Sequence, residues 1–246
     1  MTNSYIELES LNEEIINCHQ CPRLVEWRES VARLKRKAYA DWEYWGKPVP
    51  GFGDARARIL VLGLAPGAHG SNRTGRQFTG DGSGDFLFPA LHRVGFASLP
   101  RAYSRNDGLT LQDVYITATV RCAPPGNKPE VDELHNCQPY LVRELNILKP
   151  RVIVCLGRVA FDRILRIFSV RDSSYKFGHG SLYRLDAQNE QPPSKESKAL
   201  IADYRTSRPW LLCSYHPSRQ NTSTGKLNAE MFDEIWQKAR ALMDSE

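Results

Sequence analysis

A chain of 246 residues, of which 41% are hydrophobic and 10% aromatic, is long enough to bury a sizeable core as one large domain or two small ones. Its 33 lysines and arginines against 28 aspartates and glutamates give a net charge of +5, which permits a polyanionic partner without requiring one. No stretch approaches the roughly 20 apolar residues of a membrane span and no basic, apolar leader opens the sequence, so we expect no membrane partner and a cytoplasmic, intracellular protein.

The amino-terminal part is predicted to be helical over residues 7–35, because apolar residues recur there at helical spacing. The pattern breaks at Cys18-His19-Gln20-Cys21-Pro22, whose proline suits the first turn of a second helix. An intracellular protein keeps its thiols reduced, so the six cysteines are interpreted as ligands or buried residues rather than as disulfides.

A glycine-rich loop follows the first predicted strand. The apolar run over residues 58–63 indicates a buried strand, and seven of the 23 residues in 63–85 are glycine. A loop of this length between a core strand and a helix is more often functional than a simple connector, although a flexible surface loop is the alternative. We therefore predict a site here, with polar and aromatic candidates at Arg73, Arg76, Phe78, Asp81 and Asp85.

Strands and helices alternate along the rest of the chain. The patterns predict a helix over 84–94, a strand over 114–117, a helix over 129–148, a strand over 151–156, a helix over 158–168, a hairpin from 176–185 and 201–215, and a last helix over 228–243. Pro139 lies inside the second of these helices and predicts a kink or two helices. Residues 186–200 are polar and predict a mobile insertion.

This alternation predicts one domain over 1–246, a three-layer α/β/α fold with a central, mostly parallel four-stranded sheet. Ligands of such sheets bind beyond the carboxyl ends of the strands. Three conspicuous loops lie at these ends, over 63–85, 118–129 and 216–226. We expect the three loops to form one site.

Four of the cysteines form a candidate metal centre. Cys18 and Cys21 make a C-x-x-C pair, and Cys122 and Cys137 come from a distant loop and the helix after it. Four thiolates suit zinc or an iron–sulfur cluster, and spacing does not choose between them. Because four protein ligands leave no position for water, the expected role is structural. The other two, Cys155 and Cys213, are interpreted as buried strand residues.

Polar side chains also occupy the second and third loops. His216 follows the last strand, where it could donate a hydrogen bond to charge that develops on a ligand. Ser218 and Asn221 offer small polar groups for phosphate contact, and Asn127 offers the paired donor and acceptor that can read a base edge. Dinucleotide and P-loop motifs are absent, and Ser83 lacks the frame of a serine hydrolase.

The most specific motifs are Gly63-Leu64-Ala65-Pro66, Asn72-Arg73-Thr74-Gly75-Arg76, Phe78-Thr79-Gly80-Asp81, Arg121-Cys122-Ala123-Pro124-Pro125 with Asn127-Lys128-Pro129, and His216-Pro217-Ser218 with Asn221. In these, and over nearly its whole length, the chain resembles the uracil-DNA glycosylase superfamily and specifically its family 5, the B type. The resemblance implies a monomeric, monofunctional base excision repair enzyme. Such an enzyme flips uracil, and other deaminated bases such as hypoxanthine, out of DNA and hydrolyses the N-glycosidic bond to leave an abasic site.

The resemblance also implies a 4Fe–4S cluster on the four cysteines, with zinc as the alternative. It makes Asp81 the residue that stabilises the sugar or orients water, with Asp85 as the alternative, and His216 the donor to O2 of the leaving base. Substrate-binding positions that it implies, beside Asn127 at the base edge, are Gly63, Ala65, Phe78 as the stacking ring, Ser218 and Asn221.

The sequence departs from related families at two places. Leu64-Ala65 stands where families outside family 5 carry an acidic or amide residue, and Ala118 stands where family 4 carries an amide. The sequence is also consistent with two other functions. One is a nucleic-acid-binding module that a metal holds together and that has no catalytic activity, and the other is a small-molecule hydrolase on the same fold.

Overall fold

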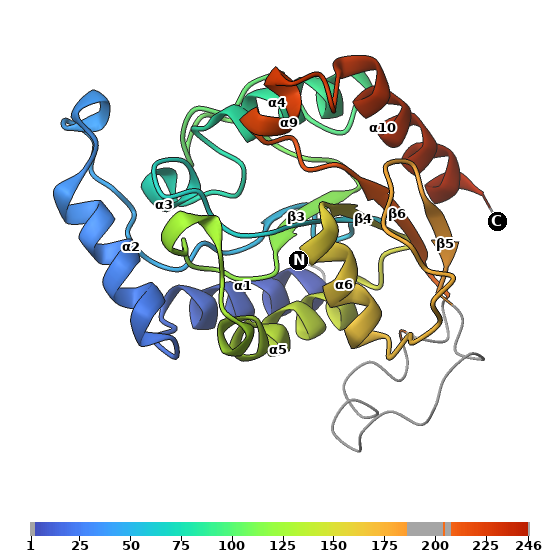
Figure 1. Cartoon of the computed structure of the whole chain (residues 1–246), viewed down its shortest axis with the longest axis horizontal. Helices are drawn as coiled ribbons and strands as arrows, with labels where there is room; N and C mark the ends of the chain where they lie inside the picture. The colour runs from blue at the N-terminus through green and yellow to red at the C-terminus, as the bar shows by residue number, and fades with distance from the viewer. Residues whose placement is uncertain (1–2, 186–203, 205–207, 246) are drawn as a thin grey trace.

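The computed structural model describes residues 3–185, 204 and 208–245, so the insertion expected at 186–200 lies outside the described residues. One sheet of six strands lies at the centre of this part of the chain, in the order β1-β3-β2-β4-β6-β5 (Figure 1). Its four central strands are mutually parallel: β3 (Val114–Ala118), β2 (Ile59–Gly63), β4 (Val152–Leu156) and β6 (Trp210–Ser214).

The two edge strands run antiparallel to their neighbours and correct the predicted strand number of four. β5 (Leu182–Arg184) pairs with β6 as the predicted hairpin, and β1 (Phe52–Gly53) pairs with β3. A strand of two residues is too short to show the alternation on which strand prediction depends. The predicted α/β class and mostly parallel sheet are otherwise confirmed.

Helices cover both faces of the sheet and complete the three layers. The helices α4 (Gly82–Arg93) and α10 (Ala229–Asp244) pack on one face, and α5 (Val131–Leu148) and α6 (Arg158–Ile167) on the other (Figure 1). A hydrophobic core lies on each face of the sheet, and successive residues of β2 point into the two cores alternately. Ile59 and Val61 face α4 and α10, whereas Leu60 and Leu62 face α5 and α6. Burial on both faces explains the continuous apolar run of the sequence.

Two amino-terminal helices pack beside the sheet, the first against α5 and the second against α3 (Ser71–Thr74). The first, α1 (Asn3–Ile16), packs along α5, and the second, α2 (Pro22–Leu34), begins with Pro22 in its first turn as predicted. Arg23 of α2 donates from Nε and Nη2 to the carboxylate of Glu133 in α5, at 2.9 and 3.0 Å. A short 3-10 helix, η1 (Lys37–Tyr39), follows.

Pro139 does not divide the helix in which it lies. The helix α5 is one element from Val131 to Leu148 rather than two. Pro139 is exposed, so the carbonyl of His135, which loses its helical donor, can be solvated by water on that side.

Three loops meet at one edge of the sheet because the strands that they follow are parallel. These loops contain the short helices α3 (Ser71–Thr74), η2 (Pro125–Asn127) and α9 (Arg219–Ser223), which follow β2, β3 and β6. Among the helices of the described residues, none combines the length and the apolar character needed to span a bilayer.

Candidate active site

A cavity of about 430 Å³ opens between the three loops. Seven of the eight residues predicted to catalyse or to bind substrate line it, and Asn221 does not. The lining residues are Gly63, Leu64, Ala65, Gly67, Ser71, Gln77, Phe78, Asp81, Ser83, Ala118, Gly126, Asn127, His216, Ser218 and Gln220. The convergence of loops that was inferred from the order of elements is therefore present in the structure.

Asp81 is held at the amino terminus of α4. Its Oδ1 accepts from the backbone amides of Ser83 and Gly84, at 3.0 and 3.3 Å. Burial raises the pKa of the Asp81 carboxyl, and these two amides and Arg219 oppose the rise. The second oxygen, Oδ2, faces the glycine loop, where a Cβ at Gly70 would come within 2.0 Å of it. Gly70 thus makes room for the carboxylate.

Phe78 forms one wall of the cavity. Its backbone has a φ of 51°, which is unusual for a bulky residue and indicates a conformation that the surrounding loop enforces. Its ring lies against the end of β2, where a Cβ at Gly63 would come within 2.8 Å of Cζ. The ring also stacks on His216, with centroids 5.8 Å apart and planes inclined by 27°.

His216 presents a neutral imidazole to the cavity. Burial lowers its pKa to about 4, so the ring is uncharged at neutral pH. The turn that follows it is tightly held: Asn221 donates from Nδ2 to the His216 carbonyl at 2.8 Å, and Ser218 caps α9 by accepting from the Asn221 amide. Asn221 therefore supports His216 from behind.

The pKa of His216 makes the stability of the fold depend on pH. Because the folded-state pKa of about 4 lies below the ordinary 6.5, the unfolded chain binds the extra proton first. The neutral His216 ring therefore contributes fully to the free energy of unfolding above pH 6.5. This contribution falls by about 3 kcal/mol as the pH drops to the folded-state pKa. Urea unfolding at several pH values should show this loss in the wild type and a smaller loss in His216→Leu; equal losses would contradict it.

A buried ion pair anchors the loop that carries Asn127. Arg121 donates from Nη2 to Glu144 Oε2 at 2.5 Å, and Thr117 of β3 donates to the same carboxylate. Arg121 is 1% and Glu144 0% exposed, so the loop is fixed at its start. Asn127 itself is exposed at the cavity and has a φ of 57°, which asparagine tolerates better than most residues.

The four predicted ligand cysteines come together beside this loop. Cys18 follows α1, Cys21 precedes α2, Cys122 follows β3, and Cys137 lies in α5. Burial, together with a smaller effect from the charges of neighbouring thiolates in this group, raises the pKa of Cys122 to about 11 and of Cys137 to about 12. Among the described residues, no three acidic, histidine or cysteine side chains are arranged to hold a single metal ion.

Arg28 supplies positive charge next to these thiols. Its side chain is 1% exposed, Nη1 donates to Cys122 Sγ at 3.1 Å and to the Cys18 carbonyl at 3.3 Å, and Nε is buried without a partner in the part of the chain that the structure describes. A buried guanidinium requires compensating negative charge, and the exposed Glu29, with Oε1 3.6 Å from Nη2, supplies only part of it. The donor set therefore fits an anionic thiolate-bound group.

The remaining two cysteines lie elsewhere, on the sheet. Cys155 of β4 and Cys213 of β6 are register partners, and both are fully buried. This agrees with their interpretation as core residues.

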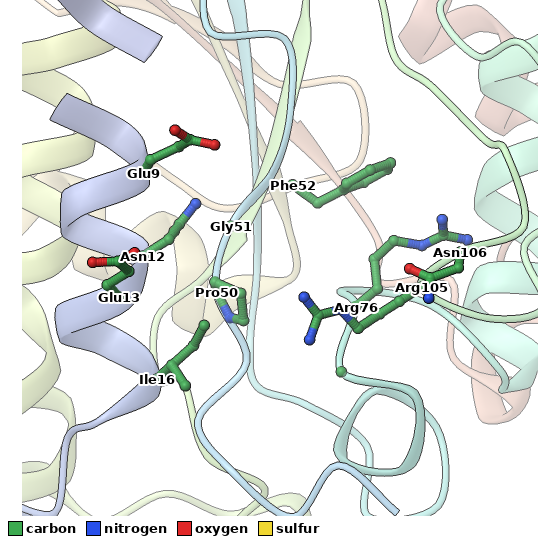
Figure 2. Close-up of a pocket in the computed structure, with 11 residues that line it drawn as sticks. Glu9, Asn12, Glu13, Ile16, Pro50, Gly51, Phe52, Arg76, Arg105 and Asn106 are labelled. Carbon is green, nitrogen blue, oxygen red and sulfur yellow. The ribbon is translucent and has the colours of Figure 1, made fainter. Parts of the chain in front are cut away.

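A second cavity, of about 420 Å³, lies between α1 and the β1 edge of the sheet (Figure 2). Glu9 and Glu13 line it from α1, and Arg76 and Arg105 line it from the opposite side. The arginines make contacts within the protein: Arg76 pairs with Asp107 at 2.6 Å, and Arg105 stacks on Trp45. Arg76 is the one candidate of the glycine-rich loop in this lining, and none of the eight residues predicted to catalyse or to bind substrate lines it, so we assign this cavity no part in the chemistry.

Some residues of the active-site cavity were missed by the reasoning from sequence. These are Ser71, Gln77, Ser83 and Gln220. Small or neutral polar residues have no charge or spacing pattern that marks them. For Gln77 the available signal was its position immediately before Phe78 in the glycine-rich loop.

Comparisons with known proteins agree with this geometry. The model of the uracil DNA glycosylase superfamily matches residues 50–240. The chain is 47% identical to the type-5 uracil-DNA glycosylase of Thermus thermophilus, 45% to that of Mycobacterium leprae and 41% to that of Pyrobaculum aerophilum. These matches cover 96%, 96% and 92% of this chain and 99%, 95% and 89% of the relatives. The chain therefore belongs to the uracil-DNA glycosylase superfamily and, within it, to the type-5 family.

Proposed function

We propose that this protein is a monofunctional DNA glycosylase that hydrolyses the N-glycosidic bond of uracil in DNA and leaves an abasic site. The observation that carries the proposal is the meeting of Asp81, Phe78 and His216 in one cavity at the carboxyl ends of the parallel strands. The names of the type-5 relatives support it.

The base reaches this cavity by rotation out of the duplex. A base inside a stacked helix cannot enter an enclosed pocket, so glycosylases extrude it. Phe78 offers a ring on which the flipped base stacks, a contact worth about 1–3 kcal/mol. Asn127 and backbone amides of the loop then contact its polar edge, and Ser218, which also lines the cavity, offers a hydroxyl for phosphate contact.

His216 acts on the leaving base. When the bond between the sugar and N1 breaks, the electron pair stays with the base and negative charge spreads to O2. A neutral imidazole N–H that donates to O2 stabilises this charge, and one such donor typically contributes about 2.7–4 kcal/mol to transition-state stability. The ring is neutral because burial lowers its pKa to about 4.

Asp81 acts on the sugar side of the same bond. Its carboxylate stabilises the oxocarbenium-like sugar or orients the water whose oxygen adds to C1′, as carboxylates do in other glycosidases. Within the described residues it is the only carboxylate that lines the cavity, and Asp85 is exposed outside the lining. The walls at Leu64, Ala65 and Ala118 are apolar. These observations favour Asp81 over Asp85.

We expect uracil and other deaminated bases such as hypoxanthine to be substrates, and a monomer that works on DNA inside the cell. The test is incubation with oligonucleotides that contain uracil, hypoxanthine or a thymine mismatch, followed by alkaline cleavage of abasic sites. Cleavage at uracil is expected. Binding to these oligonucleotides without strand cleavage would instead favour the nucleic-acid-binding module.

The same proposal includes a 4Fe–4S cluster held by Cys18, Cys21, Cys122 and Cys137. Zinc needs four sulfurs at about 2.3 Å from one ion, whereas a cluster is bound by thiolates that lie farther apart. The buried Arg28 beside Cys122 supports an anionic thiolate-bound group at this place, and the resemblance to family 5 favours the cluster over zinc. Its role is structural: it joins the α1–α2 turn to α5 and to the loop that carries Asn127.

Cys18→Ala is expected to abolish the cluster. The wild type should contain iron and inorganic sulfide in equal amounts and absorb visible light, and the variant should lose both, because three thiolates do not complete the ligand set. Cys213→Ala is the matched control, since this buried thiol lies in the sheet and should leave the iron content unchanged. A colourless wild type with one zinc per chain would contradict the cluster.

A further inference from the structure

Gln77 is a buried amide at the wall of the active-site cavity. The residue is 1% exposed and lines the cavity together with its neighbour Phe78. Its Nε2 donates to the backbone carbonyl of Val49 at 3.1 Å. A carbonyl can only accept, so this contact assigns the orientation of the amide.

The oxygen of this amide is left without a donor. Gln77 Oε1 receives no hydrogen bond within the described part of the chain. It does not belong to the unpaired polar atoms that are sealed from solvent, so it faces open space. Because the rest of the residue is enclosed, the space that Oε1 meets is the cavity that Gln77 lines.

The surrounding loop holds this residue rigidly. Thr79 donates from Oγ1 to the Gln77 carbonyl at 3.2 Å, and Arg76 donates from Nε to the same hydroxyl at 3.0 Å. Arg76 is itself fixed by two hydrogen bonds to Asp107, at 2.8 and 2.6 Å. With the backbone held in this way, the side-chain amide could turn its NH2 towards the cavity only by giving up the bond from Nε2 to the Val49 carbonyl.

The geometry points to Gln77 as a specificity-determining residue whose Oε1 accepts the ring N–H of a flipped lactam base. This inference rests on the proposed function and names the chemical class of its substrates. Uracil carries an N–H at N3 and hypoxanthine carries one at N1, each beside a carbonyl. Cytosine and adenine, the bases from which they arise by deamination, carry an unprotonated nitrogen at these positions.

Such an acceptor separates uracil and hypoxanthine from cytosine and adenine, the bases from which they arise, by repulsion. Cytosine or adenine would place a lone pair against Oε1 and leave a buried acceptor unpaired. A site that hydrogen-bonds its substrate rejects an analogue without that hydrogen bond far more strongly than an apolar pocket rejects a substrate of different size. Thymine has the same N–H as uracil, so Gln77 gives no discrimination against its methyl group.

The test compares oligonucleotides with uracil or N3-methyluracil under single-turnover conditions. The wild type should excise uracil at least about 100-fold faster, because the methyl group replaces the hydrogen that Gln77 accepts. Gln77→Met keeps the length of the side chain and removes the acceptor, so it should slow uracil excision and lower the uracil to N3-methyluracil rate ratio at least about tenfold. Gln237→Met, at an exposed glutamine of α10 outside the cavity, should keep the wild-type ratio.

The possible outcomes separate this inference from the proposed function. If the wild type excises no uracil, the proposed function is wrong. If it excises uracil but Gln77→Met keeps the wild-type ratio, Gln77 does not read the N–H. Should Gln77→Met fail to fold because the bond to Val49 is lost, the wild type alone decides: equal rates on uracil and N3-methyluracil would overturn the assignment.

Discussion

Asp81→Asn is expected to lower the single-turnover rate of uracil excision by about 10²–10⁴-fold, the range found when a positioned acid or base is removed. The fold should survive, because Asn caps a helix as well as Asp does and can still accept from the amides of Ser83 and Gly84. The variant loses only the negative charge that stabilises the positive charge developing on the sugar. Rates measured by quenched cleavage of a uracil oligonucleotide, beside thermal unfolding of both proteins, check this.

The pH dependence of the same reaction gives a second readout for Asp81. Burial raises the pKa of its carboxyl above the ordinary 3.8, so protonation removes the charge as the pH falls through that raised value. The wild-type rate should decline at acidic pH, and Asp81→Asn should lack this decline. Asp85→Asn is the matched control, since Asp85 is exposed outside the cavity, and it should keep both rate and profile. A wild-type rate in Asp81→Asn would remove the role.

The meeting of the three loops could be predicted because it follows from topology alone. Once the apolar runs are parallel strands, their carboxyl ends lie at one edge, and residues as distant as Asp81 and His216 come together without any knowledge of side-chain contacts. The cysteine group could be predicted for a similar reason, since the C-x-x-C pair and Cys122 have a chemistry that few other residue types share.

What the sequence did not reveal depends on burial and orientation. The length and glycine content of the long loop indicated only that it is functional, whereas the structure shows that Gly63 and Gly70 make room for Phe78 and Asp81 inside the protein. No motif in the sequence marks Arg28, and the structure buries it against Cys122. Gln77 carries no charge, so only its contact with Val49 shows which atom faces the cavity.

His216→Ala is expected to slow excision by about 10²–10³-fold, the usual effect of removing one donor to a developing anion. The hydrogen bond strengthens only as charge moves onto the base, so kcat should fall while KM stays nearly constant. His216→Gln, which retains an N–H donor, should recover part of the loss. His92→Ala, at an exposed histidine of α4, should behave as the wild type.

The pH profile decides which form of His216 does this work. Because burial lowers its pKa to about 4, the ratio of wild-type to His216→Ala rates should stay constant between about pH 5.5 and about pH 8. A charged imidazolium would instead make the ratio rise steeply as the pH falls through the ordinary value of 6.5. A constant ratio near one would leave the ring with a packing role against Phe78, whereas a large constant ratio identifies a neutral donor that the protein keeps uncharged by burial.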